Sequence, residues 1–190
     1  MDVSAAELLQ AWEDGAALHP VRRALLLLSA AWPETPEAAF ARVSIGRRDA
    51  RLLTLRQHLF GSSLTGVGNC PACGEQIELM FQTGDIRTPE PQMESDAPLE
   101  LVLEGYRVQF RLPCSADLLA VTPIRETGPA RRALLGRCVL AVEGPGGDPA
   151  DALPGRIEGA VVARMEEADP QGNVQLTLEC PGCGHHWLQP

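Results

Sequence analysis

Two copies of one short pattern decide the fold of this chain: Cys70-Pro-Ala-Cys73-Gly and Cys180-Pro-Gly-Cys183-Gly. Each copy places two thiols on one tight turn. The glycine after the second cysteine supplies a positive φ angle, which lets nearby backbone N–H groups point at sulfur. Four cysteines from two such turns complete the tetrahedral shell of a structural zinc site. We therefore predict one structural Zn²⁺ bound by Cys70, Cys73, Cys180 and Cys183, which would close most of the chain into a single loop.

The four cysteines also allow other interpretations. A redox C-x-x-C motif needs a thiolate at the N-terminus of a helix, and neither turn opens a convincing helical pattern. Two separate metal-linked dimer contacts and iron–sulfur ligation are compatible with the residue types. His185 and His186 follow the second turn and could replace a cysteine ligand. Because four thiols already satisfy the ion, we expect both histidines to lie outside its shell.

Composition limits the function classes. The chain has 190 residues and a formal net charge of −9, and only 4% of it is aromatic. An acidic chain opposes broad nucleic-acid binding, which needs a clustered basic surface. The N-terminus shows no signal-peptide pattern, and the longest apolar stretch, 24–32, is far too short to span a bilayer. We expect a cytoplasmic, reducing location, where paired C-x-x-C turns favour metal over disulfides.

The predicted fold class is α+β: an N-terminal helical bundle plus a four-cysteine zinc ribbon that is split by an inserted α+β segment. We divide the chain into a helical head (1–66), the first half of the ribbon (67–83), a linker (84–97), the inserted segment (98–172) and the second half of the ribbon (173–190).

Helix signals are clearest in the head. Ser4 and Glu7 form a capping box that opens a first helix, through about residue 17. A second helix begins at Pro20 and runs to about residue 31, and a short third follows Thr35-Pro36. Ser44 caps a fourth helix, to about residue 59.

The rest of the chain mixes strands and helices. Alternating residues predict a hairpin of strands 99–103 and 108–112. Ser115 with Asp117 caps a helix, and further helices are expected over 129–142 and 157–168, with a loop over 144–149 between them. Single strands are expected near 78–82, after the first cysteine turn, and over 174–179, before the second.

Other side chains are weaker candidates. Trp12 and Trp32 fit a core role, whereas Trp187, beside the second cysteine turn, is a candidate partner contact. Cys138 fits the core, and Cys114 could be mildly activated before a helix cap. The fourth helix has a basic face that could dock an acidic partner, although a solvated, ion-paired face is the commoner explanation. That face comprises Arg42, Arg47, Arg48, Arg51 and Arg56, of which Arg47, Arg48 and Arg51 are our candidate contacts.

No catalytic pattern stands out. We find no H-E-x-x-H or H-x-E metal motif, no Ser/His/Asp set, no phosphate-binding glycine loop and no paired carboxylates. We therefore expect a protein that is not an enzyme.

The order of several segments resembles a known family. They are Pro20-Val-Arg-Arg-Ala-Leu-Leu-Leu-Leu, Ser44-Ile-Gly-Arg-Arg-Asp-Ala-Arg-Leu-Leu, the first cysteine turn, Tyr106-Arg-Val-Gln-Phe-Arg-Leu-Pro113, and the second cysteine turn with His-His-Trp187. Together they are similar to the baseplate hub assembly chaperone family of contractile-tailed phages and related contractile injection systems. Members of that family extend beyond the last segment, so we expect this chain, ending at Pro190, to be a trimmed or short form.

The resemblance implies a non-enzymatic role in assembling or capping the hub at the baseplate centre. The implied partners are hub, tube or spike proteins of a contractile particle, with no nucleic acid, membrane or small-molecule substrate. On that basis, the arginine face and the linker are expected to contact a hub protein. The alternative class is a zinc-ribbon nucleic-acid-binding regulator, and a third is a zinc enzyme.

Overall fold

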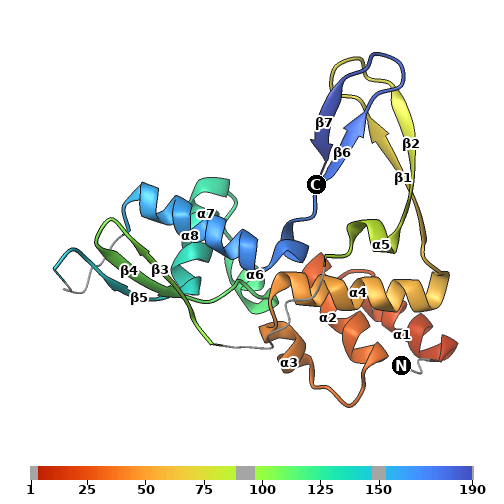
Figure 1. Cartoon of the computed structure of the whole chain (residues 1–190). Coiled ribbons are helices and arrows are strands. Elements are labelled where there is room, and N and C mark those ends of the chain that lie inside the picture. Colours follow the sequence, from red (N-terminus) through yellow and green to blue (C-terminus); the bar gives the residue numbers. More distant parts are fainter. Residues whose placement is uncertain (1–3, 89–96, 147–152, 190) are drawn as a thin grey trace.

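The structure is a computed structural model that describes residues 4–88, 97–146 and 153–189. It has three parts, a helical head, a ribbon of short strands above the head, and a lobe of helices and strands beside it (Figure 1). Helices and strands occur together in this arrangement, which confirms the α+β class. No helix in the described part of the chain is long and apolar enough to cross a membrane.

The head matches the helix signals in the sequence. It consists of α1 (Ala5–Gly15), α2 (Pro20–Ala31), α3 (Glu37–Arg42) and α4 (Ile45–Phe60). The predicted capping box is present at Ser4 and Glu7, and the Ser44 hydroxyl accepts from the first turn of α4. Leu25, Leu28 and Phe40 form the buried centre of the head.

The ribbon contains two hairpins, where the sequence predicted one strand beside each cysteine turn. The first pairs β1 (Ser63–Asn69) with β2 (Gln76–Gln82), and the second pairs β6 (Leu176–Glu179) with β7 (His186–Gln189). Strands β1 and β7 were not predicted. Because β1 begins at Ser63, the ribbon starts before position 67, inside the segment assigned to the head.

The segment after β2 also differs from the prediction of a plain linker. It begins with the short helix α5 (Thr83–Ile86), and Thr88 donates its backbone N–H to Gln171 Oε1 at 2.8 Å. The remainder of the predicted linker, 89–96, lies outside the described residues.

The lobe contains a three-stranded antiparallel sheet in the order β3-β4-β5. The predicted hairpin is present as β3 (Leu99–Leu103) and β4 (Tyr106–Phe110), and β5 is Val139–Glu143. Helices α6 (Ser115–Val121), α7 (Thr127–Cys138) and α8 (Gly155–Ala168) and the 3-10 helix η1 (Pro170–Asn173) complete the lobe. Its core is a buried cluster of Val108, Phe110, Ile157 and Val161.

Two details of the lobe correct the sequence prediction. The helix predicted over 129–142 ends at Cys138, and the next five residues pair with β4 as a strand. The N-cap of α6 is Cys114 rather than Ser115, which is the first helical residue. The loop predicted over 144–149 lies outside the described residues from position 147 onward.

The N-terminus of α4 joins the head to the lobe. Asp169, just before η1, accepts the backbone N–H of Gly46 at 2.8 Å, so it caps a helix that lies 123 positions earlier in the chain. A methyl group on Gly46 would overlap the Asp169 carboxylate and the backbone of Gly172. The glycine in the Ile-Gly-Arg-Arg segment is therefore required by the close approach of η1 to α4.

Candidate metal centre

The cysteine turns bring their four sulfur atoms together at the tip of the ribbon, where the β1–β2 and β6–β7 loops meet (Figure 1). All four atoms lie within 4.8 Å of one another. Cys70 Sγ lies 3.7 Å from Cys183 Sγ, and Cys73 Sγ lies 3.6 Å from Cys180 Sγ. Sulfurs bound tetrahedrally at about 2.3 Å from zinc would lie about 3.8 Å apart. These two spacings are therefore compatible with a metal site, and they are much longer than the ~2.05 Å of a disulfide bond.

The two turns have the same backbone structure. The N–H of Cys70 donates to the carbonyl of Glu75 at 2.8 Å, and the N–H of Cys180 donates to the carbonyl of His185 at 2.9 Å. Gly74 and Gly184 have φ angles of 77° and 70°, as the sequence predicted for the position after each second cysteine. The cysteine set therefore consists of two equivalent halves.

Backbone N–H groups surround the sulfur atoms. Burial opposes ionisation of Cys70, but N–H donors from Cys73 and Ala72 outweigh it and lower the pKa of Cys70 to about 7. Cys180 accepts from Gly182 and Cys183 in the same way, yet burial keeps its pKa raised. N–H groups that point at sulfur stabilise thiolates, the form that binds metal. The donor set thus fits a metal with a preference for four thiolates, such as Zn²⁺.

Glu75 and His185, which follow the two cysteine turns at equivalent positions, make different contacts. Glu75 reaches toward the second turn, where its Oε2 lies 3.7 Å from Cys180 Sγ and occupies the space that a side chain at Gly182 would need. His185 instead stacks on Trp187, with 6.1 Å between the ring centroids. Within the described residues, the group of potential ligands contains the four cysteines and neither His185 nor His186.

The candidate partner contacts on α4 do not form one exposed basic row. Arg48 is buried, pairs with Asp49 at 2.7 Å and donates to the Ser115 hydroxyl at 3.3 Å. Arg51 lies over the Phe40 ring, 5.6 Å from its centroid. Arg47 is half-buried. Arg48 thus connects α4 to α6, and a docking role on this face stays a prediction only for Arg47 and Arg51.

The tryptophans also differ from expectation. Trp32 packs against the buried cluster of the head, as predicted. Trp12, predicted to lie in the core, is 70% exposed. Trp187 is half-buried, and its role as a partner contact stays a prediction.

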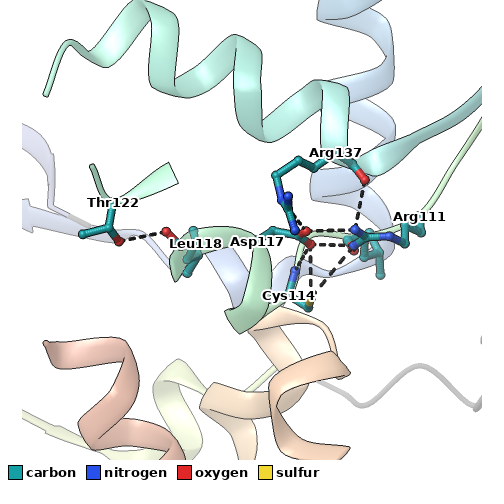
Figure 2. Close-up of polar contacts among 7 residues, drawn as sticks. Arg111, Cys114, Asp117, Leu118, Thr122 and Arg137 are labelled. Carbon is teal, nitrogen blue, oxygen red and sulfur yellow. Dashed lines mark hydrogen bonds and ion pairs between the residues drawn. The ribbon is translucent and has the colours of Figure 1, made fainter. Parts of the chain in front are cut away.

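A buried ion-pair cluster in the lobe was not found from the sequence. Asp117 is buried on α6 and accepts hydrogen bonds from Arg111 and Arg137, which come from the end of β4 and from α7 (Figure 2). Burial alone would raise the pKa of Asp117, but hydrogen bonds from Arg111 and from Cys114 hold it well below its ordinary value. The two arginines lie 6 and 20 positions from Asp117, so no local sequence pattern identifies the cluster.

The same cluster decides the state of the two remaining cysteines. Burial and the neighbouring Asp117 carboxylate raise the pKa of Cys114, so the predicted mild activation is wrong. Burial raises the pKa of Cys138 to about 11, and this residue belongs to the interior as predicted. Both thiols therefore stay protonated near neutral pH.

A cavity of about 400 Å³ lies between the start of α4, helices α7 and α8, and η1. Its floor is mainly apolar, with side chains such as Leu134, Val162 and Met165. Its charged residues are Arg131, Glu166 and Asp169, and Asp169 is committed to the N–H of Gly46. The cavity is therefore a mainly apolar pocket where the head meets the lobe.

These observations define an α+β protein with a split ribbon and a candidate four-cysteine metal centre. The family model described as "T4 bacteriophage base plate protein" matches residues 32–189, which include both cysteine turns, and the chain belongs to this family. The match begins one residue after α2 ends, so α1 and all of α2 lie outside its range. No curated protein and no solved structure gives a match.

Proposed function

We propose that this protein is a non-enzymatic, zinc-binding assembly factor for the baseplate hub of a contractile phage tail or a phage-tail-like injection system. It would act as a chaperone or a structural component in the cytoplasm. The observation that carries the proposal is the family match over 32–189. A phage baseplate role follows from that match, and the resemblance of the cysteine turns and the Ile-Gly-Arg-Arg segment to hub chaperones supplies the finer assignment.

The metal centre supports a structural role for the ion. Four thiolates complete a tetrahedral shell, whereas catalytic zinc keeps a position open for water or substrate. The site joins residues 70–73 to residues 180–183, and the lobe lies between them in the chain. Metal binding would therefore stabilise the closed arrangement of the ribbon, because the binding free energy is available only when both turns are folded.

The surface of the ribbon supports protein partners. Val67 and Met80 are 63% and 81% exposed on the β1–β2 hairpin, and Leu188 on β7 is 61% exposed. Charged residues are scarce here, since the 22 residues of the four strands include only Glu78 and Glu179. Exposed apolar side chains with few charges are typical of protein interfaces.

The arginine contacts argue against nucleic acid as the main partner. Arg48 is buried, and Arg56 donates to the carbonyls of Gly61 and Ser63. Arg107 pairs with Glu100 and Glu143. Nucleic-acid binding needs cations that are free to neutralise phosphates, and the net charge of −9 further opposes it.

Co-expression of the chain with candidate hub, tube and spike proteins from the same contractile particle tests the proposal. We expect a stable complex with at least one of them and one zinc ion per chain by elemental analysis. The cobalt-substituted protein should show the absorption spectrum of four sulfur ligands. Absence of binding to every baseplate protein, together with steeply salt-dependent binding to DNA or RNA, would instead support the nucleic-acid-binding alternative.

A further inference from the structure

Helix α1 half-buries Leu8, but it leaves its two other large apolar side chains, Leu9 and Trp12, exposed. Ala11 and Gly15 are buried against α2, and Gly15 lies directly beside the Arg23 side chain. In contrast, Leu9 is 56% exposed and Trp12 is 70% exposed. A helix that is held only by a protein core normally buries its largest apolar residues. The two side chains contribute little to the stability of the head, and because they are adjacent on the helix they are available for contact with a partner.

Leu9 and Trp12 lie three positions apart and so share one face of the helix. This α1 stripe, defined as Leu9 and Trp12, borders the face that packs on α2. Figure 1 shows α1 at the outer edge of the head, on the side away from the lobe, so neither the lobe nor the ribbon covers it. Large side chains at such spacing on an open helix are the anchors by which an amphipathic helix enters a groove. Tryptophan is also the residue most enriched among those that dominate binding energy.

The charges of α1 are all of one sign. Glu7, Glu13 and Asp14 are acidic, and the described helix contains no basic residue. Glu7 is bonded within the capping box and Asp14 accepts from Gln10, whereas Glu13 forms no ion pair within the described residues. Glu13 is the i+4 neighbour of Leu9 and adjoins Trp12. On α2, Arg23 faces this end of α1, and it donates to the carbonyls of Gly15, Ala16 and Leu18.

We propose that α1 is a docking helix that inserts the Leu9–Trp12 stripe into an apolar groove with a basic rim on a partner protein. The apolar floor would take Leu9 and Trp12, and lysine or arginine on the rim would pair with Glu13. This inference rests on the proposed function for the kind of partner, which is another baseplate protein. The family match begins at residue 32, so α1 lies outside the matched region.

A second copy of the chain fits the α1 stripe less well. Two α1 helices in contact would bring their acidic side chains together, and like charges on facing helices repel. A groove on another protein can add its own walls and opposite charges to the contact.

The test measures binding of the full-length protein to the co-expressed baseplate protein that co-purifies with it. We expect the double variant Leu9→Ala/Trp12→Ala to weaken binding about 30-fold, the effect of losing a dominant anchor. The matched control is Gln10→Ala, which truncates an exposed side chain elsewhere on α1 and should leave affinity within twofold. Because Leu9 and Trp12 are exposed, melting temperatures should not change.

Charge reversal adds a second measurement. Glu13→Arg should weaken binding about threefold at low salt, the size expected for one exposed ion pair, and the difference should fade as salt rises. Asp14→Arg, farther around the helix from the stripe, is its control. Equal binding by the Glu13→Arg and wild-type proteins at low salt would overturn the basic rim.

The remaining outcomes separate this inference from the proposed function. Unchanged binding by the double alanine variant would overturn the docking helix and leave the hub role intact. No binding of the wild type to any baseplate protein would overturn the hub role and this inference together. A wild-type dimer in sedimentation that Trp12→Ala converts to monomer would assign the stripe to a second copy and also overturn the proposal.

Discussion

The ribbon and the lobe both contain short antiparallel hairpins, but different interactions stabilise the two parts. In the four ribbon strands, Ile77 is the single buried apolar side chain. The lobe instead encloses Val108, Phe110, Ile157 and Val161. Two-stranded hairpins are marginally stable in water without such a core. The comparison indicates that the four cysteines replace apolar burial in the ribbon, so the ribbon should depend on metal and the lobe should not.

Loss of one metal ligand should have the largest effect. Structural zinc sites contribute roughly 10–16 kcal/mol of apparent binding free energy, which is available to folding. We expect Cys73→Ser and Cys183→Ser to act alike, because the two turns are equivalent, and to lose stoichiometric zinc and most of the metal-dependent rise in melting temperature. Elemental analysis and thermal unfolding measure both. Cys138→Ser, outside the site, is the control, and its zinc content should stay that of the wild type.

Truncation in the lobe core should produce the opposite pattern. Phe110 is fully buried, and Phe110→Ala should cost about 3–5 kcal/mol of unfolding free energy through lost burial and the cavity that remains. Zinc content should not change, because the ribbon does not use this core. Urea unfolding measures the cost, and Phe60→Ala is the matched control, since Phe60 is 73% exposed. A large zinc loss in Phe110→Ala would mean that the two parts fold as one unit.

The ion-pair cluster of the lobe should contribute less than the apolar core. Asp117→Asn keeps the shape but removes the charge that pairs with Arg111 and Arg137, and we expect a loss of about 2–3 kcal/mol. The arginines are 37% and 44% exposed, so water can partly replace the lost partner. Asp14→Asn on the exposed face of α1 should be nearly neutral.

Asp117 should also make the stability of the fold depend on pH. The pKa of Asp117 is lowered in the folded protein, so its stabilisation is present above the unfolded pKa of about 3.9 and is lost as pH falls through the folded value. The stability difference between the wild type and Asp117→Asn should therefore be constant from pH 5 to 7 and shrink below about pH 4. Denaturation at several pH values measures it, and a difference that grows on acidification would contradict the assignment.

A smaller effect is expected at the joint between head and lobe. Gly46→Ala should cost about 1–3 kcal/mol, because the added methyl overlaps Asp169 and forces η1 away from α4. Gly159→Ala in α8 is the control. A side chain at Gly159 meets open space, so there the change should instead stabilise the protein by about 0.5–1 kcal/mol. Equal effects in calorimetry would show that η1 does not constrain position 46.

Much of this fold could be predicted because its signals are local. Caps at Ser4 and Ser44 located two helices, alternation located the β3–β4 hairpin, and the spacing within each cysteine turn identified the four candidate ligands. These patterns depend only on neighbouring residues and on the backbone periods of helices and strands.

The missed features depend on partners that are distant in the sequence. Strand β1 contains Gly66 and Gly68, which weaken a strand pattern, and its pairing with β2 decides its conformation. Arg48 was predicted as one charge in an exposed row, but it is buried and bonds to Ser115 at the start of α6. Asp117 meets arginines from two other elements. Trp12 fitted a core pattern, but periodicity does not show which apolar face a neighbouring helix covers.

Hydrogen exchange before and after metal removal tests the central claim most directly. Amide exchange would be measured by mass spectrometry on the zinc-loaded protein and on the same protein after chelation, with zinc loss checked by elemental analysis. We predict a large gain in exchange in β1, β2, β6 and β7 and a smaller one where η1 meets α4, while β4 and α8 keep their protection. Unchanged protection of the ribbon strands in the metal-free protein would contradict the account.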